Sequence, residues 1–110
     1  MSFNVIATDP YVRKLKKLSK KYRSLKSDLA PIIEKLAENP TIGTLLGNAC
    51  YKIRVAISSK GKGKSGGARM ITYVRILKEN VFLLDIYDKS DQNTITDKEL
   101  KLLIALLSEE

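Results

Sequence analysis

The spacing of apolar residues changes halfway along the chain, and this change restricts the possible fold more than any other feature. Between residues 12 and 36, apolar residues recur every three or four positions, which predicts amphipathic helices. Between residues 51 and 87 they alternate with polar residues or form short runs, which predicts strands. Residues 3–7 predict a first strand, and a capping-box pattern at residues 96–99 predicts a C-terminal helix. Because helices and strands are grouped, we expect an α+β fold with a mostly antiparallel twisted sheet, in the order β-α-α-β-β-β-α.

The two predicted helices form a basic helical hairpin near the start of the chain. The first follows Asp9 and Pro10, of which Asp9 is a suitable N-cap and Pro10 suits the first turn. The second is expected over about residues 25–38. Residues 11–26 contain eight lysines and arginines and no acidic residue, so this hairpin carries much of the positive charge.

Three more strands are expected after the hairpin, over residues 51–57, 68–77 and 81–87. A basic, glycine-rich loop at residues 60–67 joins the first two of them. No internal repeat or long linker divides the chain, so we expect a single domain over residues 1–110.

Charge and missing residue types exclude several classes of protein. The chain has 20 lysines and arginines against 12 acidic residues, a formal net charge of +8, which predicts an anionic partner, nucleic acid first and an acidic protein second. One cysteine and no histidine exclude a disulfide framework, a Cys- or His-rich metal site and a histidine base, and we expect no metal and no cofactor. No apolar run reaches the roughly 20 residues of a membrane helix. The first residues also lack a signal-peptide pattern, so we expect a cytoplasmic protein.

The glycine-rich loop contains the pattern GxGxxG at residues 61–66, together with Gly-Lys-Ser. Nucleotide-binding motifs of this kind need a helix directly afterwards, whereas the following residues predict a strand, so we do not expect a nucleotide site. Lys60, Lys62 and Lys64 are instead candidates to contact a phosphate backbone. The alternative is an ordinary hairpin loop without a ligand.

Four cations are expected to gather beside the predicted sheet. Lys52 and Arg54 share one side of their strand, Arg69 opens the next strand and Lys89 follows the last one. Since like charges repel, such a cluster indicates a place where an anion binds. The alternative is that Lys52 and Arg54 simply point into solvent.

Two tyrosines, one cysteine and one aspartate in this region have structural interpretations beside or in place of functional ones. Tyr73 and Tyr87 either stack on a base or transfer a proton, or else fill space in the core. Cys50 is expected to be a buried, unreactive side chain. Asp85 lies within an apolar strand, and it either pairs with a cation or marks a place where the strand leaves the core.

Three stretches of the sequence together resemble the RelE/ParE toxin superfamily, and within it the RelE/HigB-like branch. They are the basic strand CYKIRVAI at residues 50–57, the glycine-rich hairpin KGKGKSGGARMITY at residues 60–73, and the strand and polar run LLDIYDKSDQNTIT at residues 83–96. The order of the predicted elements is similar to that family over essentially the whole chain.

The resemblance implies the toxin of a type II toxin–antitoxin module, an endoribonuclease that cleaves mRNA, usually in the ribosomal A site, and so inhibits translation. Its implied partners are a cognate antitoxin protein, mRNA and the ribosome. The two basic strand positions of the family fall on Lys52 and Arg54, the arginine after the glycine-rich turn on Arg69, and the basic residue after the last strand on Lys89. A tyrosine that some members carry near the C-terminal helix is missing here, and Tyr87 is the candidate to replace it.

The implied reaction needs no metal: the 2′-OH of RNA attacks the adjacent phosphate and leaves a 2′,3′-cyclic phosphate and a 5′-OH. Without histidine, we expect Lys52 to act as the base, because neighbouring cations disfavour its charged form and lower its pKa. Arg54 and Arg69 are expected to hold the phosphate oxygens, and Lys89, with Tyr87, to support the leaving oxygen. Further RNA contacts are expected from Lys60, Lys62, Lys64 and Tyr73.

Two other functions fit the same sequence. A ParE-like member of the superfamily would inhibit DNA gyrase without cleaving RNA, since a shared fold does not fix function. A non-catalytic module that binds nucleic acid would need only the uneven distribution of charge. Cleavage of translated messages separates both from the first interpretation.

Overall fold

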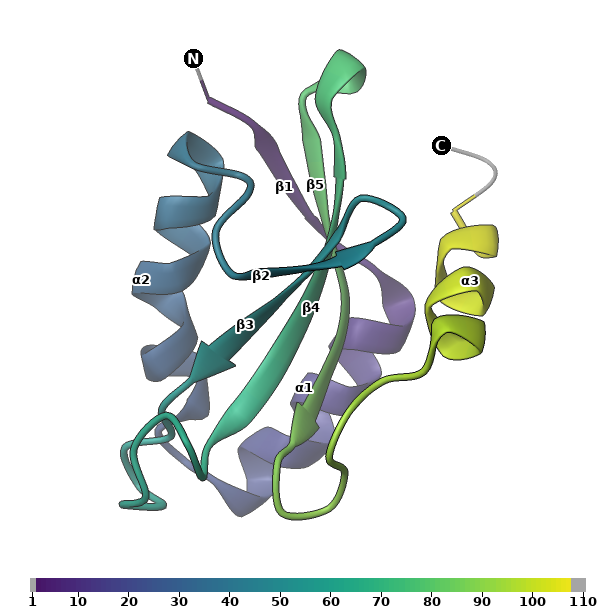
Figure 1. The fold of residues 1–110 in the computed structure, drawn as a ribbon. Coiled ribbons are helices and arrows are strands. Elements are labelled where there is room, and N and C mark those ends of the chain that lie inside the picture. The colour runs from purple at the N-terminus through teal and green to yellow at the C-terminus, as the bar shows by residue number, and fades with distance from the viewer. Residues whose placement is uncertain (1, 108–110) are drawn as a thin grey trace.

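The computed structural model describes residues 2–107, which form a five-stranded sheet with helices on both sides (Figure 1). In chain order the elements are β1 (Asn4–Ala7), α1 (Asp9–Lys21), α2 (Leu25–Glu38), β2 (Thr44–Gly47), β3 (Cys50–Val55), β4 (Ala68–Arg75), a 3-10 turn η1 (Ile76–Lys78), β5 (Asn80–Asp88) and α3 (Asp97–Ala105). The predicted α+β class and grouping of elements are confirmed, with one strand added. None of the helices in this part of the chain is long and apolar enough to cross a membrane.

The strands lie in the order β1-β5-β4-β3-β2. β1 runs parallel to β5, and the other neighbouring pairs are antiparallel. β3, β4 and β5, which carry most of the predicted site residues, are therefore neighbours in the sheet, as the sequence analysis required.

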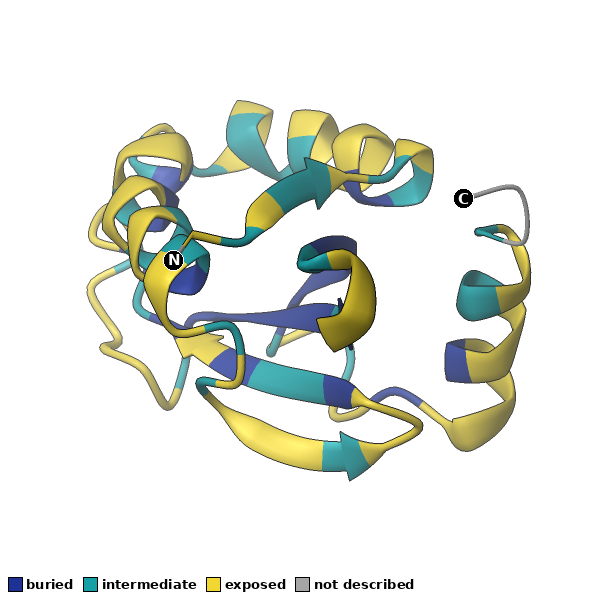
Figure 2. Cartoon of the chain, turned by 90° about the horizontal axis from the view of Figure 1, so that it is seen from above, coloured by how far each residue is buried: buried dark blue, intermediate teal, exposed yellow. Residues whose placement is uncertain are grey.

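One face of the sheet is covered by α1 and α2 and holds the larger core. Side chains at alternate positions of β3, β4 and β5 point to this face, as period-two spacing predicts. Figure 2 shows the buried residues in the middle of the molecule and exposed residues along the outer surfaces of the helices. The fully buried contributors to this core include Leu25, Leu29, Leu36, Val55, Met70, Val81 and Ile86.

The opposite face of the sheet is only partly covered, by α3. Figure 1 shows α2 on one side of the strands and α3 on the other. Leu100 of α3 is buried against a smaller cluster made by β3, β4 and β5, which includes Cys50, Ile71, Phe82 and Leu84. The predicted capping box starts α3, because Thr96 accepts from the Glu99 N–H and Glu99 accepts from the Thr96 N–H.

The sequence analysis did not predict β2, which pairs with β3 at the edge of the sheet. The strand is only four residues long and largely exposed, so its residues show no alternation. Its hairpin turns at Asn48 and Ala49, whose φ angles are +54° and +60°. Two left-handed residues suit a hairpin turn, but Asn-Ala lacks the glycine that normally signals one.

Element ends also differ from the predictions. The strand predicted over 68–77 ends at Arg75 because η1 begins at Ile76. Thr8, and not Asp9, is the N-cap of α1, and its hydroxyl donates to the carbonyl of Leu83 instead of capping the helix. Asp9 and Pro10 occupy the first turn, where a negative charge and a missing N–H are both tolerated.

Candidate functional site

Lys52, Arg54 and Arg69 meet on the partly covered face, near the end of the sheet where β3 ends and β4 begins. Arg54 of β3 is paired in register with Arg69 of β4, and Arg69 is paired with Tyr87 of β5. Lys52 lies two residues before Arg54 and therefore on the same face. Lys52, Arg54 and Arg69 are called the cation row below. Opposed residues in a sheet have Cβ atoms about 5 Å apart, where like charges destabilise the fold unless something compensates them.

Lys52 and Arg54 have no compensating partner within residues 2–107. Arg54 is exposed and Lys52 is half-buried, and neither side chain makes a hydrogen bond or ion pair in this part of the chain. Asp85 of β5 lies in register with Lys52 across Ile71, but Lys14 of α1 binds it, with 2.8 Å between Nζ and Oδ1. Asp85 thus pairs with a cation, one of its two predicted alternatives, and the positive charge on the sheet stays uncompensated.

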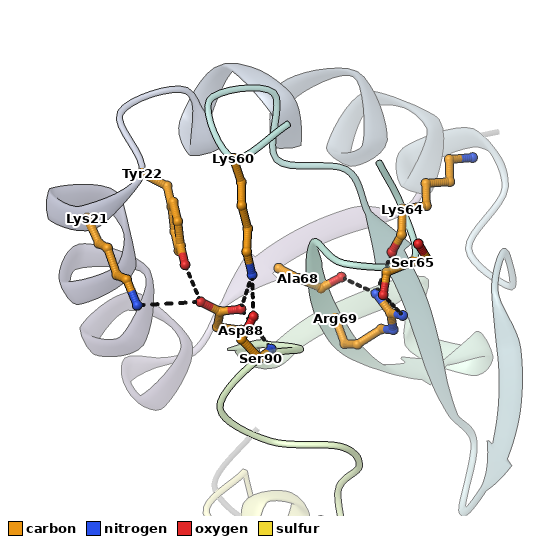
Figure 3. A network of polar contacts seen from close by, with 9 residues as sticks. All are labelled: Lys21, Tyr22, Lys60, Lys64, Ser65, Ala68, Arg69, Asp88 and Ser90. Carbon is orange, nitrogen blue, oxygen red and sulfur yellow. Dashed lines mark hydrogen bonds and ion pairs between the residues drawn. The ribbon is translucent and has the colours of Figure 1, made fainter. Parts of the chain in front are cut away.

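Arg69, in contrast, is buried, and its guanidinium is hydrogen-bonded to backbone carbonyls. Only 4% of the residue is exposed. Its Nη1 donates to the carbonyl oxygens of Lys64, at 2.8 Å, and Ala68, at 3.0 Å, and its Nη2 donates to that of Ser65, at 3.3 Å (Figure 3). The guanidinium is therefore turned toward the glycine-rich loop (residues 60–67), and its contacts offset the repulsion from Arg54.

Tyr87 lies below the surface rather than at it. The residue is 4% exposed, and its hydroxyl is buried without a hydrogen-bond partner in the described chain. Burial raises the pKa of this phenol; the Arg69 charge lowers it, and the charges of Asp85 and Glu99 raise it further. The sequence analysis expected Tyr87 to support the leaving oxygen together with Lys89, and the structure places its phenol in an enclosed position beside Arg69.

Lys89 lies at the end of β5, next to the start of β4. Its backbone N–H donates to the carbonyl of Gly67 at 3.0 Å, and its half-buried side chain donates to Asn93 Oδ1 at 2.8 Å. Arg69 is paired with Tyr87, and Lys89 follows Tyr87 by two residues along the chain. The structure therefore brings Lys89 to the same corner of the sheet as Arg69.

The residue before Lys89 organises a cluster of polar side chains that the sequence analysis missed. Asp88 is 1% exposed and accepts from Tyr22 Oη, from Lys60 Nζ at 2.7 Å and from the Ser90 N–H at 2.9 Å (Figure 3). Lys21 Nζ lies 3.8 Å away. Burial on its own raises the pKa of Asp88, but the donors from Lys60, Tyr22 and Ser90 outweigh it and hold the pKa well below its usual range. We call Tyr22, Lys60, Asp88 and Ser90 the Asp88 cluster.

The predicted RNA contacts divide into two groups. Lys62 and Lys64 are exposed on the glycine-rich loop, where they are available to a ligand. The Lys60 side chain is only 10% exposed, lies 5.4 Å from the Tyr22 ring centroid and is bound to Asp88, so its charge is already neutralised. The half-buried Tyr73 ring stacks on Phe82, with the ring centres 6.2 Å apart.

A second basic surface lies on α1, away from the cation row. Its cations line a shallow depression of about 440 Å³ and comprise Arg13, Lys14, Lys16, Lys17 and Lys20. No acidic residue lines it, and of its cations Lys14 also pairs with Asp85, so α1 presents a positive surface on this side of the molecule.

With this geometry in place, the family model for the RelE toxin of the RelE/RelB toxin–antitoxin system matches residues 11–109. The chain belongs to the RelE toxin family. The RelE/ParE resemblance predicted from the three sequence stretches is thereby confirmed.

Solved structures of E. coli RelE share the fold of this RelE-family toxin. A RelE double mutant in the free state is 21% identical, with 84% of this chain and 90% of that chain covered and a TM-score of 0.60. The isolated RelE toxin is 20% identical, with 96% and 99% covered and a TM-score of 0.57. A chain of the intact RelBE toxin–antitoxin complex is 23% identical, with 79% and 96% covered and a TM-score of 0.55.

Some features of this candidate site were predictable from the sequence, and others were not. Alternation placed Lys52 and Arg54 on one face, and the pairing of β3 with β4 brings Arg69 beside Arg54. Cys50 is buried as expected, with burial raising its thiol pKa to about 11. The only sequence feature that pointed to the Asp88 cluster is the acidic residue Asp88 at the end of the apolar run of β5. Nothing local identifies Tyr22, 66 residues away, as its partner.

Proposed function

We propose that this RelE-family toxin is an endoribonuclease that cleaves mRNA bound to the ribosome and thereby inhibits translation. The observation that supports this most is the pair Lys52 and Arg54, which lie uncompensated on a partly covered sheet face beside Arg69. A fold tolerates such a row more readily when an anion binds it, and the phosphates of RNA are suitable anions.

In the proposed reaction, the 2′-OH attacks the adjacent phosphate, and a 2′,3′-cyclic phosphate and a 5′-OH result. Lys52 takes the proton from the 2′-OH. Arg54 and Arg69 bind the non-bridging oxygens, because guanidinium groups fit a phosphate with two parallel hydrogen bonds. Lys89 supports the departing 5′-oxygen from the end of β5. Tyr87 does not touch RNA in this scheme, and instead supports Arg69 from the adjacent strand.

The two basic surfaces suggest why the ribosome takes part. The message occupies the cation row, while Lys62, Lys64 and the basic depression of α1 lie outside it and are suited to ribosomal RNA. Binding through many phosphates orients the toxin without reading bases.

We further propose that a cognate antitoxin binds this toxin. The similarity to a chain of the RelBE toxin–antitoxin complex supports such a partner. With a formal net charge of +8, the toxin favours an antitoxin whose binding segment is acidic.

A primer-extension map of one message in a cell-free translation reaction tests the proposal. The wild-type protein is compared with the Lys52→Ala/Arg69→Ala double variant, and with Lys35→Ala, which removes an exposed cation from α2. We expect cuts at translated codons with wild type and Lys35→Ala, and none with the double variant. An uncut message with wild type would refute the proposal, and a gyrase supercoiling assay would then separate the ParE-like alternative from a non-catalytic binding module.

A further inference from the structure

The glycine-rich loop is held at both ends by a cation whose side chain is largely covered by the protein. Lys60 holds its beginning and Arg69, just after its end, holds the carbonyls of Lys64 and Ser65. Both cations were predicted to contact RNA, yet both are occupied by the protein itself. Lys60 is bound to a carboxylate, whereas Arg69 is bound to backbone carbonyls. This difference decides which of the two cations is able to leave its partner and bind an RNA phosphate.

Lys60 is bound to a full negative charge in a buried place. Its Nζ lies 2.7 Å from Asp88 Oδ1 and 2.6 Å from Ser90 Oγ. If Lys60 left for a phosphate, Asp88 would lose its closest counter-charge while remaining 1% exposed. Lys21, at 3.8 Å, and the Tyr22 hydroxyl would remain, but removing the closest partner of a buried ion pair is strongly unfavourable, so Lys60 stays in place.

Arg69 is bound only to neutral carbonyl oxygens. A phosphate carries a full negative charge and accepts two parallel hydrogen bonds from one guanidinium, whereas a carbonyl oxygen carries only a partial charge. Leaving the carbonyls of Lys64 and Ser65 exposes them to water, because both residues are exposed. Arg69 therefore exchanges the two exposed carbonyls for phosphate and keeps its hydrogen bond to the carbonyl of the adjacent, buried Ala68, whereas the corresponding exchange is unfavourable for Lys60.

The loop has the backbone freedom that such an exchange needs. Gly61 and Gly63 have φ angles of +74° and +63°, and a Cβ added at either glycine would meet no atom within 4 Å. Glycine reaches many other conformations at little cost, and residues 61–65 are exposed. The loop is thus free to rearrange between its two fixed ends.

We propose that the glycine-rich loop is a latch on Arg69. In the free toxin, the carbonyls of Lys64 and Ser65 hold the guanidinium away from the cation row. When RNA binds, a phosphate replaces these carbonyls as the partner of Arg69, and the loop moves away from the cation row. The Lys60–Asp88 ion pair stays intact and fixes the start of the loop. Lys60 is therefore a positioning residue and not an RNA contact. The inference rests on the proposed RNA function, since the phosphate comes from RNA.

The latch is tested by NMR with a hexaribonucleotide whose riboses are 2′-O-methylated, so that it cannot be cleaved. Arg69→Lys provides the reference for an open latch, because one ammonium group cannot reproduce the forked contacts to the loop carbonyls. Unchanged amide signals of β1 and α2 show that this variant is folded. Arg54→Lys is the matched control on the neighbouring strand, and it leaves the loop contacts intact.

At saturating oligonucleotide and low salt, we expect the guanidinium signals of Arg69 to shift and to show coupling to ³¹P across a hydrogen bond. The carbonyl ¹³C signals of Lys64 and Ser65 should move to their positions in free Arg69→Lys. The Lys60 ammonium signal should not move. Arg69→Lys should bind the oligonucleotide about tenfold more weakly, the value of roughly one hydrogen bond between charged groups.

Two adverse results are distinguishable. If Arg54 signals shift on binding while the Lys64 and Ser65 carbonyl signals stay in place, RNA binds without opening the loop and the latch is refuted alone. If no signal in the cation row responds even at low salt, the proposed RNA site fails, and the latch fails with it.

Discussion

The two faces of the sheet are built from the same strands but differ in what covers them. The face under α1 and α2 is closed by a large apolar core, whereas the opposite face has α3 over one part and the cation row over another. Leu29 on the first side is 1% exposed, and Arg54 on the second is exposed. The comparison suggests that the closed face supplies most of the stability and the partly covered face supplies the chemistry.

The largest expected effect is on the closed face. Leu29→Ala leaves a cavity between α2 and the sheet, so we expect it to lower the free energy of unfolding by about 2–5 kcal/mol in urea titrations. Leu102→Ala on α3, where the side chain is 61% exposed, should change it by less than about 0.5 kcal/mol. Equal losses in the two variants would show that stability does not divide between the faces.

The Asp88 cluster borders the candidate site, but we expect it to contribute to the stability of the fold, as the closed face does. Asp88→Asn leaves Lys60 without a counter-charge in a mostly buried place, and we expect a loss of about 3 kcal/mol at pH 7. The pKa of Asp88 in the folded protein lies below its ordinary value of 3.8, so the ionised carboxylate stabilises the fold above that value.

This stabilisation is lost as the pH falls toward the folded-state pKa of Asp88. The difference between wild type and Asp88→Asn should therefore shrink from about pH 5 downward, in unfolding titrations at several pH values. The exposed Asp91→Asn is the control and should track the wild type. A difference that stays constant down to pH 2 would contradict the charged role of Asp88.

The smallest effect on folding is expected from the glycine-rich loop. Lys62→Ala/Lys64→Ala should alter stability by less than about 0.5 kcal/mol, because both side chains are exposed. The same change should reduce the slope of log affinity against log salt for ribosome binding by about 1.5, since two phosphate contacts are lost. Lys35→Ala should leave that slope unchanged. If the double variant keeps the wild-type slope, the loop does not contact RNA.

Most of the fold followed from periodicity, because each face of a helix or strand has to be buried or exposed as a whole. The helix predicted over about 25–38 and the strands around Ile53, Met70 and Leu84 were found in this way. β2 was missed because four exposed residues and an Asn48-Ala49 turn have no periodic pattern. Its position depends on pairing with β3, which is a tertiary contact.

The site was predictable in its position but not in its partners. Alternation put Lys52 and Arg54 on one face, and this needs only the backbone. Whether a given cation is exposed depends on which carbonyl or carboxylate the fold brings to it. Lys60 meets Asp88 across 28 residues of sequence, and no local pattern indicates that contact.

The most direct test of the account is the single-turnover rate of mRNA cleavage on programmed ribosomes with Lys52→Arg. The substitution keeps the positive charge on the partly covered face but replaces the proposed base with a group that does not deprotonate. We expect unchanged binding to the ribosome and cleavage at least about a hundredfold slower, the usual contribution of a general base. Cleavage by Lys52→Arg at the wild-type rate would contradict the assignment of the chemistry to Lys52 in the cation row.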